Sequence, residues 1–421
     1  MSNQDNKLDR REFMAAAGTV TAGLLLVKPE TAFGTQANST IQVGLIGCGG
    51  RGSAVTGDFV GRAGCRIAAL GDLFGDQLEK ARANFDAANQ KQGQAAIDPK
   101  HLFKGAKACS ELCSSAVDVV VIGTPPYYHP DHLEIALQAG KHVYLEKPVA
   151  TDVRGARKVM DLGRKVGPKQ SVHVGFQIRY SPEYREMTRR IQSGAIGDIA
   201  SVQGYYLASD LPRRPAGASP METKLRNWFF YKELSGDVLV EQNIHIIDWI
   251  NWVLQAKPEK AFGTAGRKVR TDIGDVNDHF VTVYKYPNGI NVGFQSTQYL
   301  TKWADVCVRF MGSKGYAEAH YTGTVAIVGT NEWKAEPPPP SAARQRPEVD
   351  PLAEATPEKV KSFIENIKAG KYENQLVQGA ESTLSAMLGR QACYQGKELT
   401  WDQVFKSNQT WKSDVVVEKL G

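Results

Sequence analysis

The sequence has few cysteines, few long apolar runs and no strong excess of charge of one sign. Its six cysteines include no C-x-x-C pair, and none lies beside a histidine cluster of the metal-binding type. We therefore expect buried free thiols and no metal site. The uncharged stretch 14–27 has fourteen residues, too few to span a bilayer as a helix, so we expect no stable membrane insertion.

The formal net charge is +6 over 421 residues, and no stripe of basic residues alternates with aromatic ones. Nucleic acid is therefore not an expected partner. The chain also lacks internal repeats. What remains is the composition of a soluble globular enzyme, with 42% hydrophobic and 23% charged residues, and a length that predicts two domains.

The N-terminus has the order of an export signal. The segment 8–14, LDRREFM, resembles the twin-arginine signal, and an uncharged stretch and Lys28-Pro29 follow it. We interpret 1–38 as signal and leader and expect a periplasmic or otherwise exported protein. A chance pair of arginines before a buried helix is the alternative. This route carries folded proteins, often with a cofactor already bound. Because free dinucleotide is scarce outside the cytoplasm, a nucleotide-binding protein exported in this way should hold its nucleotide tightly.

A glycine-rich turn after an apolar run carries the most information. The segment 41–52, IQVGLIGCGGRG, places Gly47, Gly49 and Gly52 as G-x-G-x-x-G between a predicted strand and a helix. The first glycine makes the turn, the second lets the backbone approach a pyrophosphate, and the third lets helix and strand pack closely. The helix N-terminus adds unpaired N–H groups and a positive dipole end.

Asp72 ends the next apolar run, 65–71, at the distance expected for the carboxylate that binds a ribose diol. No arginine follows it directly, and a carboxylate repels a 2′-phosphate. We therefore predict tightly bound NAD rather than NADP as the cofactor. Arg51, in the glycine turn, is the residue that could reverse this preference.

Strands and helices alternate over the first half of the chain. Apolar runs beginning near 41, 65, 117, 142 and 171 are separated by helical patterns, which predicts an α/β fold with a doubly wound parallel sheet. Ligands of such sheets bind beyond the carboxyl ends of the strands. We expect five segments to converge at that rim: 47–52, Asp72, 124–129, 146–148 and 177–180.

After residue 180 longer alternating stretches and the hairpin signal at 287–289 predict an α+β domain with a large, mostly antiparallel open sheet. We expect Val292, Phe294, Val306 and Val308 to be available to its uncovered face. Such a face usually finds a partner, so we predict a homo-oligomer, either a dimer or a tetramer. The Pro-rich stretch 336–351 predicts an extended arm that reaches the neighbour.

The motifs IGCGGRG, GTPPYYH, EKPVA, GFQIRYSPEY, SGAIGDI and GDVLVEQNIHIIDWINWVLQ occur, with Asp72, in the order and at the spacing of the Gfo/Idh/MocA oxidoreductases. The chain resembles this family over nearly all of 41–400. The resemblance implies an NAD-binding Rossmann domain, here 39–178, a substrate-binding and oligomerisation domain, here 179–421, and hydride transfer between a nicotinamide and a carbon of a sugar or polyol.

We assign the expected site residues on that basis. The catalytic residues are Lys147, Glu241 and His245. The cofactor-binding residues are Gly47, Gly49, Gly50, Arg51, Gly52, Asp72, Thr124, Pro125, His129, Glu146, Lys147 and Gln177. The residues expected to contact a sugar or glycoside substrate are Tyr128, Arg179, Trp228 and Asp248.

Lys147 stands at the end of a predicted buried strand and before a proline. Partial desolvation would lower the pKa of its ammonium group and suit it to proton transfer near neutral pH. A salt bridge to Glu146 or a phosphate contact is the alternative. The other rim motifs favour catalysis.

His245 lies in the segment 241–248, where a helix would place Glu241 and Asp248 on the same face. A carboxylate beside an imidazole sets its tautomer and raises its basicity. The family usually has Asp at the position of Glu241. The longer side chain leaves the role of Glu241 open, but it does not change the role expected for His245. A core histidine on an apolar helix is the alternative.

Two other functions stay open at this point. One branch of the family consists of redox-neutral glycosidases, which oxidise C3 of the sugar, eliminate the aglycone, add water and reduce C3 again. Export and Glu241 fit that branch as well as they fit a dehydrogenase, although its own signature is not evident around 225–250. A non-catalytic exported sugar-binding protein is the other reading, and the set of Lys147, Glu241 and His245 argues against it.

Overall fold

The structure is a computed structural model that describes residues 40–336 and 351–420. The predicted leader 1–38 and nearly all of the predicted Pro-rich arm lie outside the described residues. The described part belongs to one compact unit that begins at Thr40. None of its helices combines the length and the apolar character that crossing a membrane requires.

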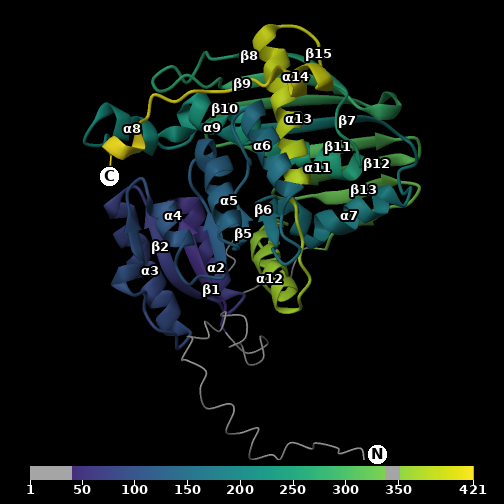
Figure 1. Cartoon of the computed structure of the whole chain (residues 1–421). Helices are drawn as coiled ribbons and strands as arrows, with labels where there is room; N and C mark the ends of the chain where they lie inside the picture. Colours follow the sequence, from purple (N-terminus) through teal and green to yellow (C-terminus); the bar gives the residue numbers. More distant parts are fainter. Residues whose placement is uncertain (1–39, 337–350, 421) are drawn as a thin grey trace, which may run out of the picture. The chain divides into compact units, whose positions relative to one another are not determined.

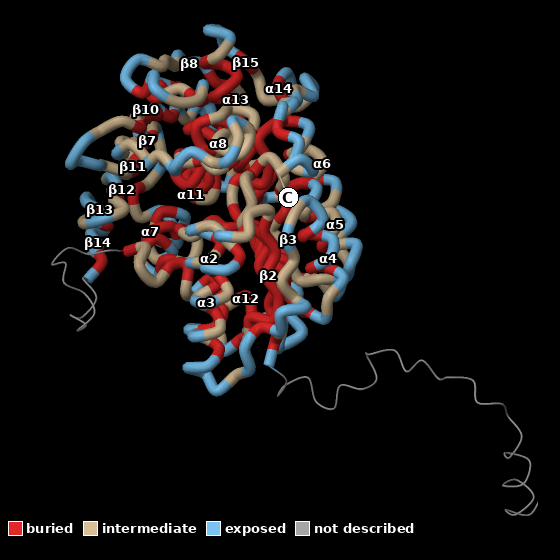
Figure 2. Tube along the Cα trace, turned by 90° about the vertical axis from the view of Figure 1, so that its left-hand side faces the viewer, coloured by how far each residue is buried: buried red, intermediate tan, exposed pale blue. Residues whose placement is uncertain are grey.

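The first half of the described chain forms a six-stranded parallel sheet with the strand order β3-β2-β1-β4-β5-β6 (Figure 1). Its strands are β1 (Gln42–Ile46), β2 (Arg66–Asp72), β3 (Leu102–Lys104), β4 (Val119–Ile122), β5 (His142–Leu145) and β6 (Val172–Val174). The continuous apolar runs of β1, β2 and β4 are explained by burial on both faces, because helices cover each side. Strand β2 accordingly appears as buried in Figure 2.

The connecting helices confirm the predicted alternation of strands and helices. They are α2 (Gly50–Gly61), α3 (Gly75–Lys91), α4 (Ala108–Cys113), α5 (His129–Gln138) and α6 (Val153–Gly163). A later helix, α12 (Ala355–Lys368), also packs on this sheet, where Phe363 contacts Phe59 and Tyr144 edge-on. The core of the first sheet is therefore completed by a segment that lies far along the chain.

The second sheet has nine strands in the order β14-β13-β12-β11-β7-β10-β9-β8-β15. Within this sheet, only β7 and β10 pair in parallel among the described strands, so the prediction of a mostly antiparallel sheet is confirmed. The strands are β7 (Ile199–Ser209), β8 (Lys260–Gly266), β9 (His279–Lys285), β10 (Asn291–Leu300), β11 (Asp305–Gly312), β12 (Gly315–His320), β13 (Val325–Gly329), β14 (Trp333–Lys334) and β15 (Leu399–Thr400).

Helices cover one face of this sheet. Figure 1 shows α11 (Ile244–Leu254) and α13 (Leu376–Gln395) in front of its strands, and α7 (Pro182–Gln192) packs beside them. The remaining helices are α8 (Pro220–Arg226), α9 (Lys232–Ser235), α10 (Val238–Glu241) and α14 (Trp401–Ser407).

The other face of the second sheet is open, and its residues differ from those we expected there. Val292, Phe294 and Val308 are buried on the face that the helices cover, and Val306 is half-buried. Successive residues of a strand point to opposite faces of the sheet, so an assignment that is shifted by one residue places every side chain on the wrong face. The exposed apolar side chains are instead those of Phe262, Val281, Val283, Tyr316 and Val328.

The C-terminal tail, 408–420, runs back from α14 toward α8, where the chain ends (Figure 1). The Trp411 backbone N–H donates to Asp152 at 2.7 Å, and Lys224 of α8 forms an ion pair with Asp414. Leu225 and Val415 join a small apolar cluster with residues that follow the strands of the first sheet, among them Phe74 after β2. The tail and α8 together form a strap at the edge of the first sheet.

Candidate active site

The glycine turn has the backbone geometry that a dinucleotide needs. Gly47 has a φ of +89°, and a Cβ there would lie 2.5 Å from the Thr124 backbone nitrogen. A Cβ on Gly52 would lie 2.3 Å from the Gly47 carbonyl oxygen, so helix α2 packs tightly on this turn. A Cβ on Gly49 would meet no protein atom within 4 Å. The room beside Gly49 is therefore where a phosphate can approach the backbone.

Helix α2 begins at Gly50, and its N-cap, Gly49, supplies no side-chain hydrogen bond. The first backbone N–H groups of the helix and its positive dipole end therefore face the turn, which favours an anion.

Asp72 ends β2 with its carboxylate held in place by the backbone. The Cys48 N–H donates to Oδ2 at 2.6 Å, and the Phe74 N–H donates to Oδ1 at 2.8 Å. Burial raises the pKa of Asp72, and these two donors act against that rise. Each carboxylate oxygen keeps a lone pair that can accept a ribose hydroxyl.

A pocket of about 750 Å³ opens between the glycine turn and α8. Eight of the expected site residues line it: Gly47, Gly49, Gly50, Asp72, Thr124, Pro125, Tyr128 and Trp228. Its volume lies within the range of small-molecule and cofactor sites. The residues present therefore fit a dinucleotide, with Gly49 toward the phosphates and Asp72 toward a ribose.

The wall opposite the glycine turn was missed by the sequence analysis. It comes from 214–218, from Leu225 and Arg226, and from Val417 of the tail. Arg226 forms ion pairs with Asp76 at 2.8 Å and Glu222 at 2.7 Å, and its guanidinium stacks 4.0 Å from the Phe74 ring centroid. No sequence motif marks this segment as part of the pocket. Its place becomes evident from contacts in the folded chain, such as the Asp76–Arg226 ion pair, whose partners lie 150 residues apart.

Lys147 and Glu241 form a buried ion pair. Lys147 follows β5, and its Nζ donates to Glu241 Oε1 at 2.8 Å and to the Glu241 backbone oxygen at 2.7 Å. Their side chains are only 10% and 8% exposed. Glu241 Oε2 is buried without a hydrogen-bond partner among the described residues. The lysine thus pairs with the carboxylate of the second half of the chain, and not with Glu146.

His245 lies in the first turn of α11, 8% exposed, with its ring edge-on to Phe176. Burial lowers the pKa of His245 well below 6.5, and the positive charges of Lys147 and Arg51 lower it further. The imidazole is therefore neutral near pH 7. Its Nδ1 is buried and has no hydrogen-bond partner among the described residues. Unpaired buried polar atoms are rare and mark places where a ligand can bind.

The continuous helix that we expected over 241–248 is interrupted. Helix α10 ends at Glu241 and α11 starts at Ile244, with Gln242 and Asn243 between them. Glu241 consequently faces Lys147 and makes no hydrogen bond to His245. The Glu241 carboxylate therefore positions the Lys147 ammonium and, contrary to our expectation, does not set the tautomer of the His245 imidazole.

Asp248 and Arg179, both expected to contact substrate, bind each other. Two hydrogen bonds of 2.8 Å join the guanidinium to the carboxylate, and Ser382 Oγ donates to Asp248 Oδ1 at 2.6 Å. Asp248 is fully buried. The pair joins the η4 turn (Gln177–Tyr180) to α11 and so fixes the helix that carries His245.

Four of the expected cofactor residues do not line the pocket and instead hold parts of the rim together: Arg51, His129, Glu146 and Gln177. Arg51 Nε donates to Glu146 Oε1 at 2.9 Å, and its Nη2 lies 3.5 Å from Gln177 Oε1. The two ring nitrogens of His129 lie 2.7 and 2.8 Å from the Pro148 and Thr124 carbonyl oxygens. His129 thereby ties the rim segment after β4 to the one after β5.

Comparison with known proteins decides the family. Residues 41–176 match the oxidoreductase family with an NAD-binding Rossmann fold, and residues 184–318 match the GFO/IDH/MocA C-terminal domain. The chain belongs to the Gfo/Idh/MocA oxidoreductase family. It is an oxidoreductase with an NAD-binding Rossmann fold, as its sheet topology and glycine turn predict.

The chain is similar to an inositol dehydrogenase and, over a shorter stretch, to a glycosyl hydrolase family protein. Inositol 2-dehydrogenase of Rhizobium meliloti (strain 1021) is 24% identical over 340 residues, which are 79% of this chain and 90% of that protein. A glycosyl hydrolase family 109 protein of Streptomyces coelicolor is 26% identical over 174 residues, 41% of this chain and 35% of that one. The solved levoglucosan dehydrogenase, in complex with NADH and levoglucosan, has the same fold, with a TM-score of 0.68, 18% identity, and coverage of 87% of this chain and all of that one.

Proposed function

We propose that the protein is an NAD-dependent dehydrogenase that oxidises a hydroxyl-bearing carbon of a sugar or polyol. The observation that carries the proposal is the buried Lys147–Glu241 ion pair together with the neutral, unpartnered Nδ1 of His245. Both halves of the chain contribute to this set. A non-catalytic binding protein has no need of a desolvated ammonium and an unpaired imidazole in the same place.

Oxidation of a carbinol requires that its hydroxyl proton leaves as the hydride departs. NAD, which the glycine turn and Asp72 would hold, would supply the hydride acceptor. The imidazole of His245 is unprotonated near pH 7, and its unpaired Nδ1 is available to accept the hydroxyl proton. The ammonium of Lys147 stabilises the negative charge that develops on the oxygen, and Glu241 holds that ammonium in position. In the reverse direction the same groups return the proton.

The choice of NAD over NADP rests on Asp72 and Arg51. Asp72 lines the pocket with free lone pairs, and its charge opposes a 2′-phosphate. Arg51 is paired with Glu146 and does not line the pocket. Lys80 and Arg214 reach the pocket wall, so they are the residues that a 2′-phosphate would use. The nucleotide that the purified protein releases on denaturation decides between the two, and NADP would refute the choice.

A redox-neutral glycosidase is the second candidate. Glu241 carries a buried carboxylate oxygen, Oε2, with no hydrogen-bond partner among the described residues, which an elimination or a water addition could use. The similarity to a glycosyl hydrolase family 109 protein over 174 residues also supports it. Such an enzyme releases nitrophenol from nitrophenyl glycosides without net NADH, whereas a dehydrogenase forms NADH with free sugars. Screening both substrate sets separates the two functions.

We also propose export by the twin-arginine route and assembly through the open face of the second sheet. The Arg-Arg pair followed by the stretch 14–27 supports export, and the exposed apolar residues of that face, Phe262, Val281 and Val283 among them, support assembly. Cell fractionation of the full chain and of a variant with both arginines, Arg10 and Arg11, replaced by lysine tests export. Light scattering at micromolar concentration tests assembly, and a monomer would refute it.

A further inference from the structure

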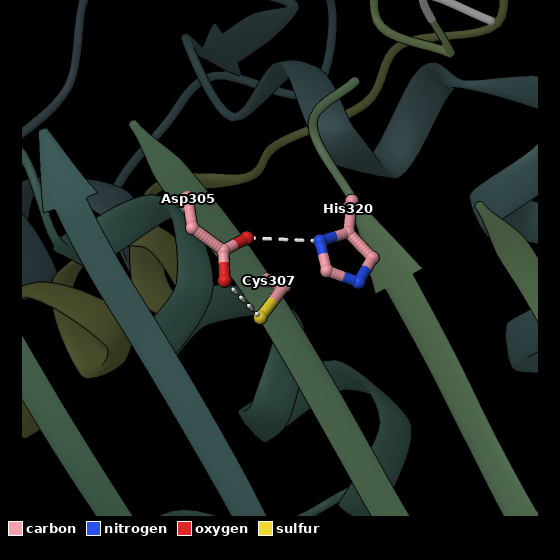
Figure 3. Close-up of side chains that lie close together, drawn as sticks. All are labelled: Asp305, Cys307 and His320. Atoms are coloured by element: carbon pink, nitrogen blue, oxygen red, sulfur yellow. Dashed lines mark hydrogen bonds and ion pairs between the residues drawn. The ribbon is translucent and has the colours of Figure 1, made fainter. Parts of the chain in front are cut away.

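Three side chains with metal-binding atoms meet on the open face of the second sheet, away from the pocket. Figure 3 shows Asp305 and Cys307 on β11 and His320 on the neighbouring β12, with their polar atoms turned toward one another. Cys307 and His320 are direct cross-strand partners, and Asp305 lies two residues before Cys307, on the same face. Strand pairing therefore brings the three together, although twelve residues lie between Cys307 and His320 in the sequence.

The distances suit a tetrahedral cation. His320 Nδ1 lies 2.9 Å from Asp305 Oδ1, Cys307 Sγ lies 3.6 Å from Asp305 Oδ2, and the three ligand atoms lie within 4.8 Å of one another. Zinc bonds of about 2.0–2.3 Å at tetrahedral angles place neighbouring ligand atoms roughly 3.3–3.6 Å apart. Side-chain shifts of a few tenths of an ångström would open the site for the ion.

A second observation concerns the far side of the imidazole. His320 Nε2 lies 2.7 Å from Glu318 Oε1, and Glu318 Oε2 accepts from Arg309 Nε at 2.6 Å. A histidine that binds a metal almost always donates its other N–H to a carboxylate, which fixes the ring and its tautomer. Here that carboxylate is present and is itself fixed by an arginine, and Nδ1 is the nitrogen left for the metal.

The same groups without a metal would form an ion-pair network of Asp305, His320, Glu318 and Arg309. That account gives Cys307 no role, since a thiol at 3.6 Å is a weak donor. Cys307 is fully buried, while the side chains of Asp305 and His320 are 27% and 21% exposed. In the single chain a cation could therefore enter from solvent, and one coordination position would remain open to water.

We propose that Asp305, Cys307 and His320 bind a divalent transition metal of the zinc type. Thiolate, imidazole and carboxylate together select a borderline ion such as Zn²⁺ over Mg²⁺ or Ca²⁺. The site is separate from the dinucleotide pocket and links β11 to β12, so its role is to stabilise this part of the open face. We expected no metal site from the sequence, because these three ligands do not lie close together in it.

Cobalt titration tests the proposal directly. The full chain, freed of tag and treated with chelator, is titrated with Co²⁺, which absorbs by thiolate-to-metal charge transfer and shows tetrahedral ligand-field bands when a cysteine binds it. We expect one such ion per chain, displaced by Zn²⁺. Cys307→Ser should abolish the charge-transfer band, whereas Cys393→Ser, a buried thiol beside Thr282, should keep it.

Glu318→Gln provides a finer test, because it leaves the three ligands in place and weakens only the support of the imidazole. We expect the affinity for Co²⁺ to fall about 10–100-fold. Circular dichroism of each variant confirms that it is folded. Absence of the charge-transfer band in the wild-type protein, or its survival in folded Cys307→Ser, would overturn the proposal. Neither result would bear on nucleotide binding or on the dehydrogenase activity.

Discussion

Replacing Lys147 by methionine should damage both stability and activity, and the two effects can be separated. The ammonium makes two hydrogen bonds to Glu241, at 2.7 and 2.8 Å, in a place where both side chains are about nine-tenths buried. Its removal leaves the Glu241 carboxylate buried and unpaired. Breaking a buried ion pair in this way costs about 3–5 kcal/mol of unfolding free energy. Loss of the charge that stabilises the developing oxyanion lowers kcat by about 10²–10³-fold.

A second substitution distinguishes the two causes. In Lys147→Met with Glu241→Gln, the uncompensated charge is gone, so most of the lost stability should return while the enzyme stays inactive. Lys158→Met is the matched control: its ion pairs with Asp131 and Glu134 are half-exposed, and their loss should cost less than about 1 kcal/mol.

Urea unfolding followed by tryptophan fluorescence gives the stabilities, with nucleotide at one saturating concentration throughout. Formation of NADH from the best sugar or polyol of the screen gives the rates. Near-normal kcat in Lys147→Met would show that the lysine is structural only. If Glu241→Gln does not restore stability to Lys147→Met, the stability lost in Lys147→Met does not come from the broken Lys147–Glu241 ion pair.

Three other variants test the site from different sides. Gly49→Val should fold but purify without nucleotide, because its side chain fills the space beside the turn; Gly57→Val, which also has open space, should retain it. His245→Asn should lower kcat about 10²–10⁴-fold with nucleotide affinity unchanged, and full activity would assign His245 to the core. The wild-type protein should lose stability below about pH 6.5, because His245 is protonated there only in the unfolded chain. His245→Asn should remove this loss. Arg226→Ala should weaken nucleotide binding roughly three- to tenfold, or about 1 kcal/mol, whereas Arg189→Ala, an exposed pair elsewhere, should not.

The first sheet could be predicted from the sequence because two physical signals agree there. Strands buried on both faces read as unbroken apolar runs, as in Val119–Ile122, and G-x-G-x-x-G between a strand and a helix is the pattern of a dinucleotide-binding turn. The convergence of Gly49, Asp72 and Thr124 on one pocket then follows from the parallel topology alone.

The parts that could not be predicted depend on contacts between distant segments. Alternation in β10 shows that one face is buried but not which one, and the packing of helices decides it. The sequence 236–254 is mostly apolar and has neither Gly nor Pro near Glu241, so nothing in it marks the break after that residue. Asp248 looked like a substrate ligand because its partner, Arg179, lies 69 residues away.

The strap has a consequence for how the cofactor is retained. Val417 lines the dinucleotide pocket, and the tail that carries it is anchored at Asp152 and Lys224, which do not line the pocket. The pocket wall therefore depends on a segment that follows both sheets in the chain. A chain that stops after Ser407 should still form both sheets but release its nucleotide on gel filtration, while the full chain keeps it. The residence time of the cofactor could then be altered at the two anchors, without changing any residue that lines the pocket.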